Sequence, residues 1–489
     1  MHFLMSQRLS FSHLLKLLAR NSFPEVSGTV GLLCFNNHWR KFHHKKANEN
    51  VLHVPDQHLQ TTHWSEEATL YVHWPYCQRR CTYCNFNKYI SSNVDNDKMQ
   101  QCLVREAKTL IQESGVKRIK SVFFGGGTPS LAQPKTLSAI LEAVSGVVSL
   151  PNDAEVSMEG NPTSVGRIKL LEFKLAGINR VSLGVQALND KDLQLLGRDH
   201  TSDESRKCIE EARRLFPGRV SIDVIFGRPG QRLSTWEKEL QEVTQICDNH
   251  VSLYQLTLER GTALFKMYEV GAVDFPSEDV TADMYELAVE IMTNERLNRY
   301  EVSSFAREGF ESLHNQSYWD GGQYIGIGPG AHGRFILRNP TAKPIPSVKI
   351  QGHDNWNPNQ LNLQPVQVNR EARIQTLEPE PWMREVLKYG HGTRKRVIQS
   401  QLDVLQEYLM VGLRTSKGVT NHRWGQFCDV TSLREVFDGD AVDDFMKEGL
   451  IVMDQFGLRA TVKGMSLLDS ILPHLLIKLQ NWFKTVKAD

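Results

Sequence analysis

The chain is poor in cysteine, in net charge and in long apolar runs, and each shortage excludes a class of protein. Eight cysteines in 489 residues are too few for a disulfide-stabilised scaffold, so we interpret the compartment as reducing. Lys and Arg total 57 against 56 for Asp and Glu, a balance that predicts no nucleic-acid partner. No apolar run reaches the roughly 18 residues that a spanning helix needs, which predicts no stable membrane insertion.

Acidic residues are also scarce in the first fifty residues. Glu25 is the single acid before Glu49, whereas Lys and Arg recur throughout this segment. A helix over residues 8–20 would place apolar side chains on one face and basic ones on the other, as in a mitochondrial presequence. We therefore predict that residues 1–50 are a presequence and linker and that the protein is located in the mitochondrion. A disordered basic tail is the alternative interpretation.

From residue 67 onward, short apolar runs alternate with longer amphipathic ones. The longer runs carry apolar residues at three- and four-residue steps, which is typical of helices. The short runs predict six strands, at residues 70–74, 119–124, 154–159, 180–184, 219–226 and 250–256. Repeated strand and helix units predict an α/β fold with a parallel sheet, open or curled into part of a barrel.

The rest of the chain changes in character after the sixth unit. We assign residues 67–335 to the sheet-containing domain with accessory elements, among them a strand at 299–306. Residues 338–368 are rich in Asn, Pro and Gln without a hydrophobic period, which predicts a flexible insertion. Helical patterns and one strand pair in residues 370–489 predict a small helix-rich C-terminal domain.

Cys77, Cys81 and Cys84 form a CxxxCxxC run directly after the first predicted strand. Loops at the carboxyl ends of parallel strands commonly carry ligands. Thiolates suit zinc or iron and sulfur, but a zinc site would need a fourth protein ligand that this spacing does not supply. A [4Fe-4S] cluster held by three thiolates leaves one iron open. The run therefore predicts such a cluster, with a substrate or cofactor on the open iron.

Other polar or glycine-rich positions fall at or near the carboxyl ends of the remaining strands. In strand order these are Gly125 to Ser130, Glu159, Gln186, Asp223 and Tyr254. Because the carboxyl ends of parallel strands share one edge, we expect these residues to line one mouth. The acids and amide would accept from an amine and hydroxyls, and Arg198 would donate to a carboxylate. For each residue alone, a purely structural hydrogen bond or turn is the alternative.

Six motifs together resemble a known family. They are "YVHWPYCQRRCTYCNF", "FFGGGTPS", "EGNPTS", "NRVSLGVQALN", "LGRDH" and "IDVIFGRPGQ". In order and spacing they resemble the radical S-adenosylmethionine (SAM) superfamily, in the branch with oxygen-independent coproporphyrinogen III oxidase and its haem-chaperone relatives. The resemblance runs from about residue 67 to the C-terminus, interrupted by the insertion. It implies a partial (β/α)6 TIM-like barrel with a small helix-rich C-terminal domain.

The resemblance also implies cofactors and the residues that hold them. Cys77, Cys81 and Cys84 would bind the [4Fe-4S] cluster, and S-adenosylmethionine would chelate its open iron. The family's S-adenosylmethionine contact positions fall on Tyr71, Tyr83, Gly126, Gly127, Thr128, Glu159, Gln186, Arg198 and Asp223. In the family's chemistry the reduced cluster cleaves the sulfonium and yields a 5′-deoxyadenosyl radical.

Phe86 departs from the oxidase pattern. The oxidases carry CxxxCxxCxC, and Phe86 stands at the place of their last cysteine. This resembles the haem chaperones, which bind haem and hand it to acceptor proteins. The resemblance implies a role in porphyrin metabolism and argues against porphyrinogen decarboxylation. We therefore expect a haem chaperone that delivers haem to mitochondrial acceptor proteins. An oxygen-independent coproporphyrinogen III oxidase, another radical SAM enzyme and a redox sensor that never cleaves the cofactor are the alternatives.

"HNQSYW", residues 314–319, looks like the HNxxYW element associated with haem in the chaperones. An imidazole is a common axial ligand of haem iron, so the resemblance implies His314 as a haem ligand. The alternatives are that His314 satisfies backbone groups beside the Gly-rich turn, or that His332 is the ligand.

Overall fold

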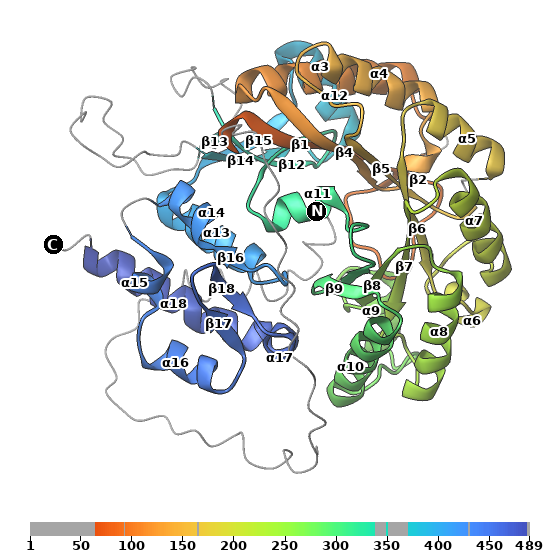
Figure 1. Ribbon diagram of the computed structural model, residues 1–489. Coiled ribbons are helices and arrows are strands. Elements are labelled where there is room, and N and C mark those ends of the chain that lie inside the picture. Colours follow the sequence, from red (N-terminus) through yellow and green to blue (C-terminus); the bar gives the residue numbers. More distant parts are fainter. Residues whose placement is uncertain are drawn as a thin grey trace.

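The computed structural model describes residues 64–91, 93–163, 166–337, 349–350, 370–428 and 431–486. The predicted presequence and most of the predicted insertion lie outside these residues. Figure 1 shows a curved sheet with helices on its outer side and, beside the open side of the curve, a blue helical part. The fold is α/β with a mostly parallel sheet, as the sequence predicts.

Six parallel strands form the centre of the large sheet, and they lie side by side in chain order. They are β1 (Glu67–Trp74), β4 (Arg118–Gly126), β5 (Glu155–Gly160), β6 (Arg180–Gln186), β7 (Val220–Phe226) and β8 (His250–Gln255). Each overlaps one of the six predicted strands, so that prediction is confirmed. Parallel neighbours in chain order require a crossover after each strand, and helices supply it.

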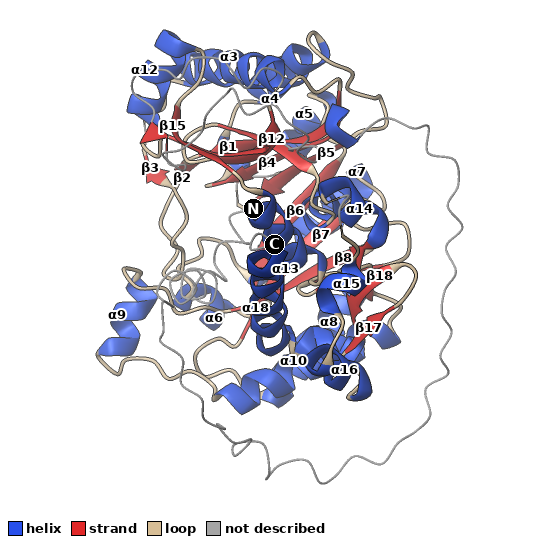
Figure 2. Cartoon of the chain, turned by 90° about the vertical axis from the view of Figure 1, so that its left-hand side faces the viewer, coloured by secondary structure: helices blue, strands red, loops and turns tan. Residues whose placement is uncertain are grey.

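Amphipathic helices follow the strands and cover the outer face of the sheet. They are α3 (Asn96–Ser114), α4 (Pro134–Ser145), α5 (Arg167–Leu175), α7 (Ser202–Leu215), α8 (Leu233–Ile246) and α10 (Glu278–Asn294). Two short helices, α6 (Asp190–Leu195) and α9 (Ala263–Glu269), instead bond to the loop around Thr82. Figure 2 shows α3 and α4 above the strands together with α12 (Pro379–Tyr389). The turn before α7 begins with a capping box, in which Thr201 and Glu204 satisfy each other's backbone N–H groups.

Alternation along the strands decides which residues face the helices and which face inward. Ile222 and Val224 on β7, and Val251 and Leu253 on β8, are buried in the hydrophobic core beneath the helices. The residues between them face the other way and line a cavity. This period of two is the geometry of any strand, and here it makes one face of the sheet apolar and the other polar.

Further strands extend the sheet at both edges. Beyond β1 lie β11 (Gln323–Ile327), β12 (His332–Ile336), β14 (Arg370–Gln375), β15 (Thr393–Ile398) and β13 (Lys349–Ile350), and beyond β8 lie β10 (Ser304–Ala306) and β9 (Asn298–Glu301). The single strand predicted at residues 299–306 is therefore wrong, because β9 and β10 form an antiparallel pair. β13 falls inside the predicted insertion and pairs with β15.

The helical part has its own core and a three-stranded sheet. Its elements are α13 (Gln401–Gly412), β16 (Val419–Thr420), α14 (Asn421–Phe427), α15 (Leu433–Phe437), α16 (Asp440–Lys447), β17 (Ile451–Met453), β18 (Gly457–Ala460), α17 (Val462–Ser466) and α18 (Leu468–Val486). Glu407 ties α13 to the large sheet, at 2.9 Å from Arg334 and 3.1 Å from Arg370. Because β14 and β15 belong to the large sheet, we propose a domain boundary near residue 400 instead of 370.

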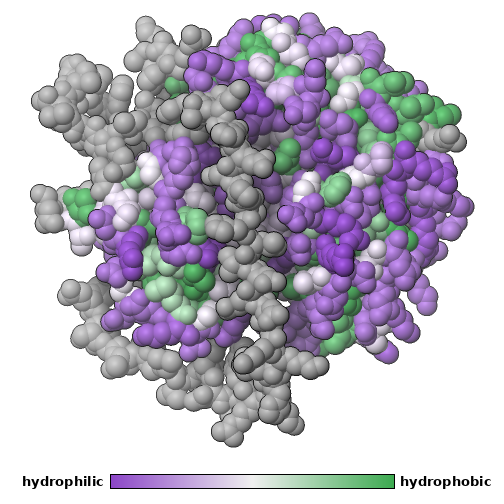
Figure 3. Space-filling view, viewed as in Figure 1, coloured by the Kyte–Doolittle hydropathy of each residue, from purple (hydrophilic) through white to green (hydrophobic). Residues whose placement is uncertain are grey.

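The surface seen in Figure 3 is mostly hydrophilic, with several green areas, of which one lies at the upper right over α5. Exposed Ile168, Leu171 and Leu175 supply it, at helical spacing. Within the described ranges, no helix is both long and apolar enough to cross a lipid bilayer.

Candidate functional site

The three cysteines lie on a loop that follows β1. The loop is closed at its base by β2 (Tyr76–Cys77), which pairs with β3 (Tyr89–Ile90). Its centre is held against the end of α6, because Thr82 N donates to Leu196 O at 3.0 Å and Thr82 Oγ1 to Leu195 O at 2.8 Å. These bonds fix the backbone between the cysteines before any ligand is bound.

Asn87 fixes the end of the same loop. Its Nδ2 donates to Pro329 O and to Leu377 O, each at 2.9 Å. The backbone carbonyl of Asn87 bonds to His73 Nε2 at 2.9 Å. Gly330 lies so close to the Asn87 side chain that a Cβ there would collide with it. The Gly-rich turn between β11 and β12 therefore supports the cysteine loop by close backbone packing.

The thiols meet hydrogen-bond donors that would favour their ionised form. Thr128 Oγ1 lies 3.3 Å from Cys77 Sγ, and Arg198 Nη1 lies 3.3 Å from Cys81 Sγ. Burial raises the pKa of Cys77 to about 11, and the Thr128 bond opposes that shift. A buried thiol of this kind needs a bound cation to lose its proton at neutral pH.

The chemistry of the donor set suits an iron–sulfur cluster. Three thiols from one loop line the same cavity. Sulfur is the ligand that [4Fe-4S] clusters use, and three thiolates leave one iron open. Cys77, Cys81 and Cys84 thus fit the predicted cluster.

The glycines after β4 allow the chain to pass close to this loop. Gly126 has φ +115°, and a Cβ there would lie 2.5 Å from His73 Cε1. A Cβ on Gly127 would lie 2.8 Å from Tyr76 O. Gly127 N donates to Trp74 O at 2.7 Å. The sequence predicts close approach here, and the closest neighbours are the cysteine loop itself and the His73 ring.

Two partly buried carboxyls line the cavity. Glu159 Oε2 accepts from Gly126 N at 3.0 Å, and Asp223 Oδ2 accepts from Ser182 Oγ at 2.9 Å. Burial raises the pKa of Glu159 to about 7, and burial raises the pKa of Asp223 to about 6 despite the hydrogen bond from Ser182. Asp223 Oδ1 has no hydrogen-bond partner among the described residues. Both acids are suited to accept from an amine or a hydroxyl.

Gln186 has a strained backbone. Its φ of +67° is rare for a residue with a side chain, and the β6–β7 register shifts at this point. Its Oε1 is buried with no hydrogen-bond partner in the described part of the chain. Strain of this kind gathers at ligand sites, where the surrounding fold over-determines the conformation.

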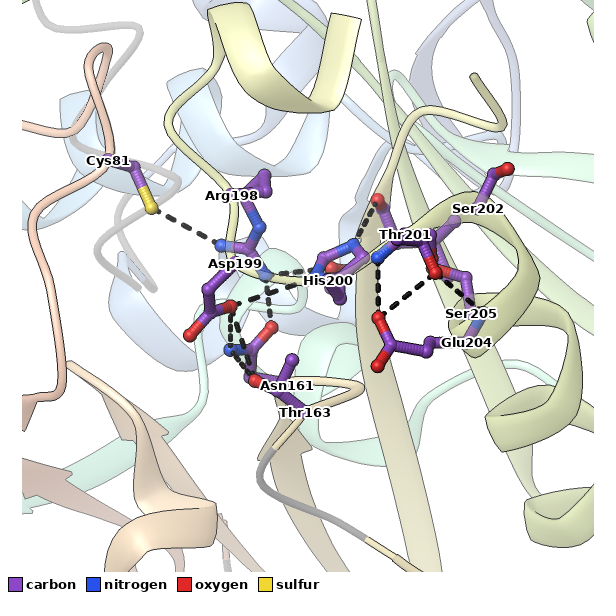
Figure 4. Close-up of polar contacts among 12 residues, drawn as sticks. Cys81, Asn161, Thr163, Arg198, Asp199, His200, Thr201, Ser202, Glu204 and Ser205 are labelled. Atoms are coloured by element: carbon purple, nitrogen blue, oxygen red, sulfur yellow. Dashed lines mark hydrogen bonds and ion pairs between the residues drawn. The ribbon is translucent and has the colours of Figure 1, made fainter. Parts of the chain in front are cut away.

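Arg198 joins the cysteine loop to β5 and β6. Figure 4 shows its side chain between Cys81 and Asn161. Nη2 donates to Asn161 Oδ1 at 2.5 Å and to Gly184 O at 2.9 Å. The next residue, Asp199, accepts from Asn161 Nδ2 at 3.1 Å. The "LGRDH" motif therefore fixes a guanidinium at the edge of the cavity.

One cavity collects most of the predicted site residues. Its lining includes Cys77, Cys81, Tyr83, Cys84, Gly126, Gly127, Thr128, Glu159, Gln186, Arg198, Asp223, Tyr254 and Phe86. Tyr71 is not in that lining. It is buried beneath Gly125, stacks on Phe123, and its hydroxyl lies 3.1 Å from His73 Nδ1.

His314 does not reach the cavity, which contradicts the expectation of a haem ligand. The ring is 1% exposed, and its nitrogens lie 2.9 Å from Ser121 Oγ and 2.8 Å from Tyr318 OH. Iron ligation would require one of these buried bonds to break. The alternative that His314 satisfies backbone groups beside the Gly-rich turn is not what the contacts show either, because both ring nitrogens bond to side-chain hydroxyls. His332 lies on β12 and is not part of the cavity lining either.

The sequence analysis missed polar residues that lie nearer the amino ends of the same strands. Glu159, Gln186, Asp223 and Tyr254 form what we call the carboxyl-end tier. Ser157, Arg180, Ser221 and His250 line the same cavity nearer the amino ends of β5 to β8, and we call them the amino-end tier. The sequence does contain a signal for them. Polar residues recur at every second position of these strands while the other positions are apolar, which predicts a polar face.

Known proteins share long stretches of this sequence. Residues 71–243 match the family model described as the Radical SAM superfamily. Radical S-adenosyl methionine domain-containing protein 1, mitochondrial, from Bos taurus is 48% identical over 417 residues, which cover 85% of this chain and 89% of that protein. This chain belongs to the radical SAM superfamily. Heme chaperone HemW from Bacillus subtilis is 34% identical over 264 residues, covering 54% of this chain and 70% of the chaperone.

Within the radical SAM superfamily, the chain therefore belongs to the HemW-like heme chaperone family. Among solved structures, coproporphyrinogen III oxidase (HemN) from Escherichia coli matches with a TM-score of 0.65 and 19% identity, over 84% of this chain and 90% of that one. At this identity the match shows the fold alone. It confirms the predicted radical SAM architecture with a helical C-terminal region.

Proposed function

We propose that this protein binds a [4Fe-4S] cluster and S-adenosylmethionine and holds haem for delivery to mitochondrial acceptor proteins. The observation that carries the proposal is the single cavity, in which three loop thiols face two partly buried acids, a strained Gln186 and Arg198. The close relatives support its haem part, since several carry the name Heme chaperone HemW.

Each residue has a role that its contacts support. Cys77, Cys81 and Cys84 hold the cluster, which when bound supplies the electron for cleavage of a sulfonium bond. Glu159 and Asp223 accept from the amine and hydroxyls of the cofactor, because each has a carboxylate oxygen turned toward the cavity. Arg198 is already bonded to Cys81 and Asn161, so it orients the loop while it offers charge to the carboxylate of the cofactor.

Phe86 favours the chaperone function over porphyrinogen oxidation. Its side chain lines the cavity beside the cysteine loop, at the position where the oxidase pattern carries another cysteine. A phenyl ring neither ligates iron nor transfers a proton, so that cysteine's chemistry is absent here. Most of the predicted S-adenosylmethionine positions line one cavity, as a radical enzyme would also require. The test below therefore includes porphyrinogen oxidation.

A mitochondrial location belongs to the same proposal. Relatives from Bos taurus, Danio rerio and Mus musculus are named mitochondrial. The acid-poor first fifty residues, which lie outside the described part, have the composition of a presequence. His314 has no part in the proposal, because both ring nitrogens are already bonded.

The test uses the full chain with its cluster reconstituted anaerobically. Haem is bound first, and the loaded protein is mixed with an apo-haemoprotein while the Soret band of the acceptor is followed. Transfer without net consumption of S-adenosylmethionine supports the chaperone function. In parallel, reductant, S-adenosylmethionine and coproporphyrinogen III are supplied, and many turnovers to protoporphyrinogen would overturn it in favour of an oxidase.

A further inference from the structure

The amino-end tier lies across four neighbouring strands and carries no role in the proposal above. Strand register pairs Ser157 with Arg180 and Ser221 with His250. All four residues are at most 3% exposed, and all four line the cavity. They therefore form one buried polar surface below the cofactor residues.

Three donors of this tier lack a partner. Among the described residues, Ser157 Oγ, Arg180 Nη1 and His250 Nδ1 have no hydrogen-bond partner. Leaving such a group buried and unpaired costs about 1–3 kcal/mol, and more for a charged one, so native proteins rarely do so. Three together on one cavity wall indicate a ligand.

Arg180 is held in position and forms an ion pair with Glu155, but its Nη1 makes no hydrogen bond. Its Nη2 donates to Ser221 Oγ at 3.3 Å and to Phe310 O at 3.0 Å, which fixes the guanidinium plane. Its Nη1 lies 3.6 Å from Glu155 Oε2, outside hydrogen-bond geometry. Ser221 accepts one of these bonds, so its own hydroxyl hydrogen is left to donate into the cavity.

Glu155 is shared between two cations. It lies 3.7 Å from Arg219 as well as near Arg180. Its oxygens accept from Ser312 Oγ and from the backbone N–H groups of Leu313 and His314. The Arg219 side chain is 46% exposed and therefore solvated, so Glu155 chiefly balances the buried Arg180. What Arg180 lacks is a hydrogen-bond acceptor for Nη1.

His250 presents a donor as well. Its Nε2 lies 2.8 Å from Tyr300 OH. Nδ1 is the ring nitrogen without a hydrogen-bond partner among the described residues, and it is a donor in the tautomer whose Nε2 accepts the Tyr300 proton. Burial lowers the pKa of His250 well below its ordinary value, and the neutral ring carries its one proton on Nδ1.

We propose that the amino-end tier binds a carboxylate group of a ligand held in this cavity. Arg180 Nη1 and His250 Nδ1 donate to it, and the hydroxyls of Ser157 and Ser221 complete the set. The match rests on the unpaired donors, because a carboxylate has two oxygens that can accept from them. The nearby acid Glu301 is already engaged by Ser303 N, by Ser304 and by Arg414.

Two sources can supply the carboxylate, a propionate of haem or a free organic acid. The choice of haem as the source rests on the function proposed above. The carboxylate site rests on the unpaired donors alone. The first experiment therefore omits haem and titrates carboxyl-labelled ¹³C-propionate into the full chain, with cluster and S-adenosylmethionine bound. The line width of the carboxyl resonance is the measurement.

Arg180→Gln is compared with Arg219→Gln. Arg219 is the other cation beside Glu155, and it does not line the cavity. We expect propionate to broaden with wild type and Arg219→Gln, and to bind Arg180→Gln at least about tenfold more weakly. Ser157→Val, which leaves the charges intact, should also weaken binding and serves if Arg180→Gln does not fold. Equal broadening in every variant, or none with wild type because the tier holds ordered water only, overturns the site.

The second experiment identifies the source by comparing haem with haem dimethyl ester in Soret titrations. If a propionate occupies the tier, wild type binds haem at least about tenfold more tightly than the ester, and Arg180→Gln removes the difference. Equal affinities in wild type overturn haem as the source. Failure of wild type to bind haem at all overturns the proposed function, while the propionate titration still decides the site.

Discussion

The two tiers of the cavity lie on the same four strands and have opposite chemistry. Their members are two residues apart on β5 and β7, four apart on β8 and six apart on β6. At the carboxyl ends, Glu159 and Asp223 offer acceptors, and at the amino ends Ser157 and Ser221 lie beside the donors Arg180 and His250. Both sets face inward because residues i and i+2 share a face of a strand. If both proposals hold, one strand carries acceptors for a cofactor near its carboxyl end and donors for a second ligand near its amino end.

The largest expected difference is between a substitution in the cysteine loop and one in the amino-end tier, and it concerns the cluster. Cys81→Ala should lose the cluster, because two thiolates cannot hold it, whereas Arg180→Gln should keep it. Iron content and visible absorbance after anaerobic reconstitution measure both variants. Cys208→Ala, at a buried cysteine of α7 far from the loop in sequence, is the matched control. Full iron content in Cys81→Ala would contradict the cluster assignment.

Binding of S-adenosylmethionine should separate two neighbours on β5. Glu159→Gln removes a charged acceptor and should weaken binding by about 10–100-fold, the cost of one hydrogen bond to a charged group. Ser157→Ala changes the amino-end tier alone and should leave that affinity within about twofold. Equilibrium binding to the reconstituted protein measures both. An equal loss in the two variants would mean that the tiers do not bind separate ligands.

The affinity for S-adenosylmethionine should rise with pH. The pKa of Glu159 is raised to about 7 and that of Asp223 to about 6, so both carboxyls are largely protonated in mildly acidic solution. Their ionised forms accept from the ammonium group, and binding should strengthen from about pH 5.5 to about pH 8 and then level off. Glu159→Gln should flatten most of this rise. A profile unchanged by that substitution would remove Glu159 from the contact.

The smallest expected effect concerns the packing that positions the carboxyl-end tier. Gly126→Ala forces a Cβ into the His73 ring at φ +115° and should lower the free energy of unfolding by about 1–3 kcal/mol. Gly425→Ala, at an open position in α14, should instead raise it by up to about 1 kcal/mol. Denaturant unfolding measures both. A neutral Gly126→Ala would show that the glycine is kept for ligand access.

Much of the fold could be predicted because its signals are local. The period of the hydrophobic residues predicts the six parallel strands and their helices. The spacing of the three cysteines in CxxxCxxC predicts where a cluster would bind. The β9–β10 hairpin was missed because two short strands and their turn read as one apolar run. β14 and β15 were assigned to the helical part because strand pairing across a long insertion leaves no local pattern.

The sequence by itself determined which strand positions are polar, where the thiols stand, and that Glu159 and Asp223 sit toward one edge. Only the tertiary structure decided which polar groups are satisfied. His314 looked available in the sequence, yet Ser121 and Tyr318 occupy its nitrogens, while Arg180 and His250 attracted no notice and keep unpaired donors in the cavity wall. The physical reason is that hydrogen-bond satisfaction depends on partners brought from distant strands, and spacing along the chain does not encode them.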